Sequence, residues 1–217
     1  MSEKTPAVTI RDAGPTDRVQ LRRAVVEIQE YERRLHSSRL PGEQIADAYL
    51  AWIENQVGKG GALLIAEIDR RFVGFVAGWI EHSDAIAETP DSNRFGYISD
   101  ICVVPNYRGQ RIATRLLFAI EERLSRAGIT RIRICSLAAN ASARRSYEWA
   151  GFAPYEITYE KSVMHGSVSE REPTSPHIPP RQDEPIRTAP DRFGHFYGDE
   201  KSLPFSECSC LSELRDK

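Results

Sequence analysis

The stretch of residues 97–117 constrains the fold of this chain most, because it combines a short apolar run, a glycine-containing turn and an amphipathic pattern. The run Ile98–Val104 is rich in β-branched residues and too short for a buried helix, which predicts a buried strand. Pro105 has no N–H to donate, so it ends the ladder. Beyond the turn, apolar residues recur with a helical period at Ile112, Leu116, Leu117, Ile120 and Leu124.

The start of this second element has the character of an anion site. The first N–H groups of a helix have no intrahelical acceptor, and the helix dipole places its positive end beside them. Gly109 lets the backbone approach an anion where a Cβ would intrude. A pyrophosphate cradle is therefore expected at Arg108, Gly109, Gln110, Arg111, Ile112, Ala113 and Thr114.

Two segments of the chain resemble signatures of one family. The segment V-x-P-x-Y-R-G-x-x-I-A at residues 103–113 is similar to the acyl-CoA-binding motif R/Q-x-x-G-x-G/A of the GNAT-type N-acetyltransferases. The segment N-x-x-A-x-x-x-Y-x-x-x-G-F at residues 140–152 resembles the second signature of that family. Arg111 stands where the family usually has its middle glycine. Because an arginine is tolerated at a helical position, the backbone cradle is still expected to form.

The pattern of the chain predicts an α+β fold with helices on both faces of a sheet. The resemblance implies the GNAT fold, a mixed and mostly antiparallel sheet whose two central strands splay apart to admit pantetheine. Strands are expected at 7–12, 62–68, 71–80, 98–104, 129–137 and 155–163, with helices at 16–36, 43–57, 112–127 and 140–150. A tight turn at Asp69-Arg70 makes an antiparallel hairpin, and Gly74 and Gly78 are expected at bulges or close backbone approaches.

The composition changes near residue 165, so two regions are expected. Residues 1–165 form the acetyltransferase-like domain. Residues 166–217 form a tail with seven prolines and few apolar pairs, which predicts a disordered or loosely docked segment.

The resemblance assigns acetyl-CoA as co-substrate and an amine as acceptor. It places backbone groups of Ile101, Cys102 and Val103 along the pantetheine arm, and one N–H polarises the thioester carbonyl. Asn140 caps a helix and, in the family, also bonds pantetheine. Tyr147 is the candidate general acid, because a phenol is suited to protonating a departing thiolate. The plain alternative for Tyr147 is an aromatic ring packed on its helix.

The general base is less clearly marked by the sequence. Many family members have a Glu where this chain has Ser99, which cannot act as a base unaided. Asp100 is the candidate, either acting through water or binding a cationic amine. Glu81 and His82, at the end of the preceding strand, are reserve candidates, and the amine can also lose its proton to bulk water before it binds.

Composition excludes several classes of function. The formal charge of −2 and a pI near 6.2 do not suggest nucleic-acid binding. No long apolar run predicts a membrane span, and the N-terminus lacks the apolar core of a secretory signal. Cys102 and Cys135 lie in apolar strand patterns and are expected to be reduced core thiols, which favours the cytoplasm. No metal site is expected, since the tail residues His165, His177, His195, Cys208 and Cys210 are irregularly spaced.

The sequence thus predicts an N-acetyltransferase that moves an acetyl group from acetyl-CoA directly to a primary amine of a small molecule or peptide. A homodimer is compatible with this class. Two alternatives stay open: an acyl-CoA-binding module with little or no turnover, and an interaction protein that acts through its C-terminal tail.

Overall fold

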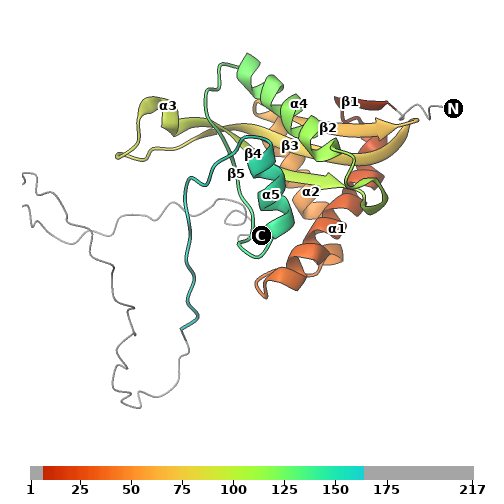
Figure 1. Cartoon of the computed structure of the whole chain (residues 1–217), viewed down its shortest axis with the longest axis horizontal. Coiled ribbons are helices and arrows are strands. Elements are labelled where there is room, and N and C mark those ends of the chain that lie inside the picture. Colours follow the sequence, from red (N-terminus) through yellow and green to blue (C-terminus); the bar gives the residue numbers. More distant parts are fainter. Residues whose placement is uncertain (1–6, 164–217) are drawn as a thin grey trace, which may run out of the picture. The chain divides into compact units, whose positions relative to one another are not determined.

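The computed structural model describes residues 7–163 of the 217-residue chain. The chain divides into two units, residues 1–155 and 156–217. The helices and strands described below all belong to the first unit (Figure 1).

The first unit is built on one five-stranded sheet with the strand order β1-β2-β3-β4-β5. Neighbouring strands from β1 to β4 are antiparallel, whereas β4 and β5 are parallel. This confirms the expected mixed, mostly antiparallel sheet. The strands are β1 Val8–Asp12, β2 Gly61–Ile68, β3 Arg71–His82, β4 Arg94–Val103 and β5 Ile132–Ile134.

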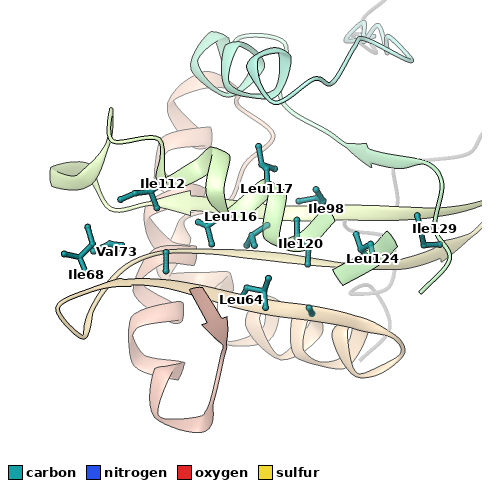
Figure 2. Packing of buried hydrophobic residues seen from close by; sticks show 13 residues of the cluster. Leu64, Ile68, Val73, Ile98, Ile112, Leu116, Leu117, Ile120, Leu124 and Ile129 are labelled. Carbon is teal, nitrogen blue, oxygen red and sulfur yellow. The ribbon is translucent and has the colours of Figure 1, made fainter. Parts of the chain in front are cut away.

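Helices cover both faces of the sheet. On one face, α1 (Arg18–Leu35) and α2 (Gly42–Gly58) pack on the sheet through a cluster that includes Leu21, Leu50 and Phe75. The other face carries α4 (Ile112–Arg126), whose Leu116, Leu117 and Ile120 lie on Ile98 and Leu64 (Figure 2). The shorter elements are η1 Pro15–Asp17, α3 Pro90–Asn93, η2 Pro105–Tyr107 and α5 Ala141–Trp149.

The two-layer packing follows directly from the sequence pattern. Successive residues of β2 alternate between the clusters, with Leu63 and Ile65 facing α1 and α2 and Leu64 and Ala66 facing α4. Complete burial of a leucine or isoleucine side chain contributes roughly 1.5–3 kcal/mol to stability. Because β2 and β3 are buried on both faces, their sequences are continuous apolar runs and do not alternate between apolar and polar residues.

The β2–β3 hairpin and its glycines behave as expected. Asp69 and Arg70 form the turn with positive φ angles of 49° and 62°, the backbone that matches the twist of a two-residue hairpin. A Cβ at Gly74 would lie 2.4 Å from the carbonyl oxygen of Cys102, so β3 and β4 require a glycine there. The register between the same two strands shifts at Gly78.

Two expectations about secondary structure are wrong. The strand expected at 129–137 is only Ile132–Ile134 long. No strand forms at 155–163, where Ile157 is 69% exposed and Tyr159 is 90% exposed. The alternating pattern of that segment favours a strand only if a neighbour accepts its backbone hydrogen bonds, and no described strand does so.

Candidate active site

The open edge of β4 organises the site. Strands β4 and β5 pair only where Gly96–Ile98 meets Ile132–Ile134. Beyond Ile98, β4 continues to Val103, but no described strand pairs with it on that side. The pairing between the two parallel strands therefore ends halfway along β4, as expected for the splayed central strands of the GNAT fold.

The ladder determines which backbone groups face this opening. The N–H of Val104 donates to the carbonyl of Val73 at 2.9 Å. Because hydrogen-bonding direction alternates along an antiparallel strand, the backbone of Cys102 faces β3, whereas Ile101 and Val103 face the open edge. Of the three residues expected along a pantetheine arm, only Ile101 and Val103 can present backbone groups to it.

The turn after β4 has the backbone geometry that an anion cradle requires. Gly109 has a φ of 78°, and a Cβ there would find no atom within 4 Å. The first intrahelical bond of α4 runs from the N–H of Arg115 to the carbonyl of Arg111 at 3.1 Å. The N–H groups of Ile112, Ala113 and Thr114 precede that bond and are available to an anion.

Arg111 does not occupy a helical position, which corrects the sequence-based interpretation. It is the N-cap of α4 and has a left-handed φ of 59°. The turn demands positive φ at this point, a backbone conformation that glycine adopts without strain and arginine does not. The guanidinium of Arg111 lies 5.0 Å from the ring centroid of Trp149 at the end of α5, so the side chain covers an exposed indole.

Arg108 contacts protein groups rather than projecting alone beside the cradle. Its Nε donates to the carbonyl of Val103 at 2.9 Å, and its Nη2 donates to Glu27 of α1 at 2.6 Å. The side chain therefore links the cradle to α1. It also engages the Val103 carbonyl, which leaves the Val103 N–H and both backbone groups of Ile101 facing the opening.

Asp100 is the buried carboxylate of the site. The phenol of Tyr49 in α2 donates to its Oδ2 at 3.1 Å, and the residue is only 7% exposed. Burial, which disfavours the charged form, raises the pKa of Asp100 to about 6, although the Tyr49 hydrogen bond acts in the opposite direction. A carboxyl group with such a pKa is a stronger base than an exposed aspartate and is still ionised at neutral pH.

A β-bulge gives Asp100 its orientation. Ala77 pairs with Asp100 and Gly78 pairs with Ile98, so Ser99 is an extra residue in β4. The bulge resets the alternation of side chains, so that Tyr97 and Asp100 both lie on the face covered by α2.

Tyr147 comes from α5 and packs against the hydrophobic cluster on the α4 face of the sheet. Its ring contacts Phe152 at a centroid distance of 6.2 Å and is half-buried. Burial raises the pKa of Tyr147 above its ordinary value, and the negative charge of Asp100 adds to the effect. The phenol thus stays protonated throughout the neutral range. At the start of α5, Asn140 accepts a hydrogen bond from the N–H of Ala143 at 3.1 Å, which confirms the expected cap.

Sequence reasoning missed several residues that surround Asp100. Glu32 in α1 and Arg39 after it form an ion pair at 3.0 Å, and the charge of Glu32 also raises the pKa values of Asp100 and Tyr147. The helical pattern of α1 and α2 identifies only buried and polar faces. It gives no signal that Glu32 or Tyr49 points toward a strand far along the chain.

The two described cysteines, Cys102 and Cys135, differ in their surroundings. Cys102 is buried, and burial raises the pKa of its thiol to about 12, as for an unreactive core residue. Cys135 is exposed rather than buried, because it follows the end of β5. Within residues 7–163 no cluster of metal-binding side chains is found, and the tail histidines and cysteines lie outside the described residues. Over the same range, no helix has the length and apolar character needed to cross a bilayer.

Comparison with known proteins places the chain in a family. The family model for the acetyltransferase (GNAT) family matches residues 25–152, which is more than half of the chain. The protein therefore belongs to the acetyltransferase (GNAT) family, whose members use acetyl-CoA as co-substrate.

Individual relatives agree with this assignment. The mycothiol acetyltransferase of Brachybacterium faecium is 34% identical over 90 residues, which are 42% of this chain and 25% of the relative. The match thus spans only about a quarter of the length of that curated relative.

Two solved structures share the fold. An aminoglycoside N-acetyltransferase in complex with CoA has a TM-score of 0.56 at 20% identity, covering 75% of this chain and all of the other. A variant of the BH1408 protein from Bacillus halodurans has a TM-score of 0.58 at 17% identity, covering 72% of this chain and 99% of the other.

Proposed function

We propose that the protein is an acetyl-CoA-dependent N-acetyltransferase that transfers the acetyl group directly to a primary amine of a small molecule or peptide. One observation supports this most strongly: Asp100 in β4 and Tyr147 in α5 lie close enough for the charge of Asp100 to act on Tyr147, and burial raises the pKa of both groups. One group is set to accept a proton and the other to keep one until it is needed.

The residues at the open edge of β4 would hold the thioester. The Val103 N–H and the backbone groups of Ile101 face the opening and can pair with an extended pantetheine arm as a further strand would. The cradle from Gly109 to Thr114 would hold the pyrophosphate. Because these contacts come from backbone, their positions are fixed by the sheet and the helix before the ligand arrives.

Asp100 would act as the base and Tyr147 as the acid. The acceptor amine must lose a proton to attack the thioester carbonyl, and Asp100 accepts it directly or through water. The carbon–sulfur bond then breaks, and the hydroxyl of Tyr147 donates its proton to the departing thiolate. A backbone N–H at the open edge of β4 would stabilise the oxyanion of the tetrahedral intermediate.

Turnover is the decisive test of this proposal. Purified protein with acetyl-CoA and a panel of primary amines should release free thiol in an amine-dependent manner. If acetyl-CoA binds but no amine accelerates thiol release, the chain is an acyl-CoA-binding module. Loss of partner capture on deleting residues 166–217, with no turnover in either form, would instead favour an interaction protein acting through its tail.

A further inference from the structure

Four aromatic side chains form a continuous strip on the α1/α2 face of the sheet. Tyr49, Trp52, Trp79 and Tyr97, here named the aromatic strip, have successive ring centroids 5.5, 5.2 and 5.7 Å apart. Trp79 and Tyr97 come from β3 and β4 and are buried, whereas Tyr49 and Trp52 come from α2 and are partly exposed. The two rings from α2 are therefore accessible to solvent in part, whereas the two rings from the sheet lie beneath the surface.

Two carboxylates contact the aromatic strip. Tyr49, at one end of the strip, donates to Asp100, and the indole Nε1 of Trp79, the third ring, donates to Glu81 at 2.6 Å. Asp100 pairs with Ala77 in the β3–β4 register, and Glu81 is four residues further along β3. With a strand rise of ~3.3 Å per residue, the two carboxylates are about 13 Å apart along the strand.

Neither carboxylate is neutralised by the protein. Within residues 7–163, Asp100 and Glu81 form no ion pair with a lysine or arginine. The nearby cations are engaged elsewhere: Arg39 pairs with Glu32 at 3.0 Å, and Arg133 lies 4.0 Å from the ring centroid of a phenylalanine in β4. Asp100 is buried, and a buried carboxylate without a cationic partner is costly, so a cationic ligand would stabilise its charged form.

The chemistry of this surface favours a long, flexible cation. Aromatic faces attract ammonium groups and also pack against methylene chains. The second carboxylate, Glu81, favours a second positive charge remote from the reacting nitrogen. A short monoamine would satisfy Asp100 alone and leave Glu81 and most of the aromatic strip without contacts.

We propose that the acceptor is a linear polyamine long enough to reach both carboxylates. Its reacting nitrogen lies beside Asp100, its methylene groups lie over Trp52, and its second ammonium contacts Glu81. This inference rests on the proposed acetyl transfer and names its acceptor class. The reacting ammonium loses one proton to Asp100, and the resulting amine forms a bond to the acetyl carbon and loses its second proton to water. The sulfur leaves with the proton of Tyr147, and the remaining ammonium still pairs with Glu81 in the product.

Binding can be measured without turnover, because two of the three tryptophans of the chain belong to the aromatic strip. The full chain, saturated with CoA, would be titrated with spermidine, spermine, ethylenediamine and butylamine while tryptophan fluorescence is recorded. Spermidine and spermine should bind at least about tenfold more tightly than the two short amines, since only they reach both carboxylates. Equal affinities for spermidine and butylamine would overturn the inference.

A matched pair of variants locates the second charge. Glu81→Gln removes the charge but keeps an oxygen that can accept from Trp79, so it should weaken spermidine binding about tenfold and leave butylamine unchanged. Glu121→Gln, on the exposed side of α4 across the sheet, should change neither. A loss of spermidine binding that is equal in the two variants would overturn the assignment of Glu81.

Turnover separates this inference from the function on which it rests. Thiol release should show the same preference for the longer amines as binding does. Selective spermidine binding without thiol release would support the acceptor surface and refute the transfer reaction. Thiol release that is equally fast with butylamine and spermidine would support the reaction and overturn the acceptor class.

Discussion

The proposed cofactor side and the proposed acceptor side of this site are built in different ways. The proposed cofactor side consists of backbone from one continuous stretch, the end of β4, the turn at Gly109 and the start of α4. The proposed acceptor side consists of side chains from α1, α2, β3 and β4 that meet only in the folded protein. A backbone site tolerates exchange of most side chains, whereas a side-chain site changes its preference with each one.

This difference predicts separate readouts for the two regions. Variants on the cofactor side should change acetyl-CoA affinity with every acceptor alike. Variants on the acceptor side should change the preference among amines and leave acetyl-CoA affinity intact. The predictions below test this separation, from the largest expected effect to the smallest.

The largest effect is expected from Gly109→Asp. The carboxylate of an aspartate at this position would lie at the proposed pyrophosphate site. A non-glycine residue there would also be strained by the φ of 78°. Acetyl-CoA at ~100 times its dissociation constant should stabilise the wild-type protein by about 2.7 kcal/mol, seen as a rise in Tm, and the variant should show no rise.

Gly109→Ala provides the control for strain, because it adds a Cβ without a charge. Backbone strain of about 1–2 kcal/mol should lower its Tm while ligand stabilisation is largely retained. A wild-type response to acetyl-CoA in Gly109→Asp would mean that the pyrophosphate lies elsewhere.

The next effect is expected from Tyr147→Phe, which removes a single hydroxyl group and conserves the ring packed on Phe152. If the phenol protonates the thiolate, kcat and kcat/KM should fall together by ~10²–10⁴-fold, with acetyl-CoA affinity unchanged. Because the pKa of Tyr147 is raised, no alkaline loss of wild-type activity is expected in the range where a free phenol ionises. Equal turnover in the two proteins would leave the ring as a packing residue only.

The comparison also explains how much of the site could be predicted from sequence. The strand, turn and helix of residues 97–117 and the Asn140 cap are local features, and local spacing identified them correctly. The Tyr49–Asp100 contact joins residues 51 apart and the Glu27–Arg108 contact joins residues 81 apart. No spacing rule encodes such pairs, since they depend on how α1 and α2 pack on the sheet.

Other features were predicted wrongly from the sequence because neighbouring segments override the local pattern. The segment 155–163 alternates like a strand but has no described pairing partner, and β5 ends at Ile134 although apolar residues continue. The bulge at Ser99 moved Asp100 onto the face of Tyr97, a consequence of register that β4 alone does not reveal. Arg111 was misplaced because its conformation depends on the turn rather than on residue type.

A third prediction uses the pH dependence of Asp100. If Asp100 accepts the proton of the amine, kcat should fall below a pH of about 6, as the carboxyl becomes protonated, and Asp100→Asn should lose most activity. Acetyl-CoA affinity should be preserved in this variant, since Asp100 belongs to the acceptor side. If kcat of Asp100→Asn still falls below a pH of about 6 as it does in the wild-type protein, another group is responsible for that titration.

The same substitution should stabilise the protein at high pH. The folded pKa of about 6 exceeds the ordinary aspartate value, so the folded state binds the proton more tightly than the unfolded state. Stability should therefore fall as the pH rises from about 4 to about 6 and stay lower above that range. An asparagine side chain has no charge to bury, so the free energy of unfolding near pH 8 should rise by on the order of 3 kcal/mol, with little change near pH 4. Equal changes at both pH values would refute the shift.

The smallest effect concerns Arg111 and tests the conformation of the cradle itself. Arg111→Ala loses the contact with Trp149 but keeps a Cβ at a φ of 59°, whereas Arg111→Gly loses the same contact and relieves the strain. Relief of left-handed strain is worth roughly 1–2 kcal/mol, and the greater freedom of glycine in the unfolded chain offsets about 0.4–1 kcal/mol of it. Denaturant unfolding should therefore find Arg111→Gly more stable than Arg111→Ala by roughly 0.5–1 kcal/mol, the reverse of their order inside a helix. If Arg111→Ala is the more stable variant, residue 111 is helical. Helix α4 would then begin at residue 111 and not at Ile112.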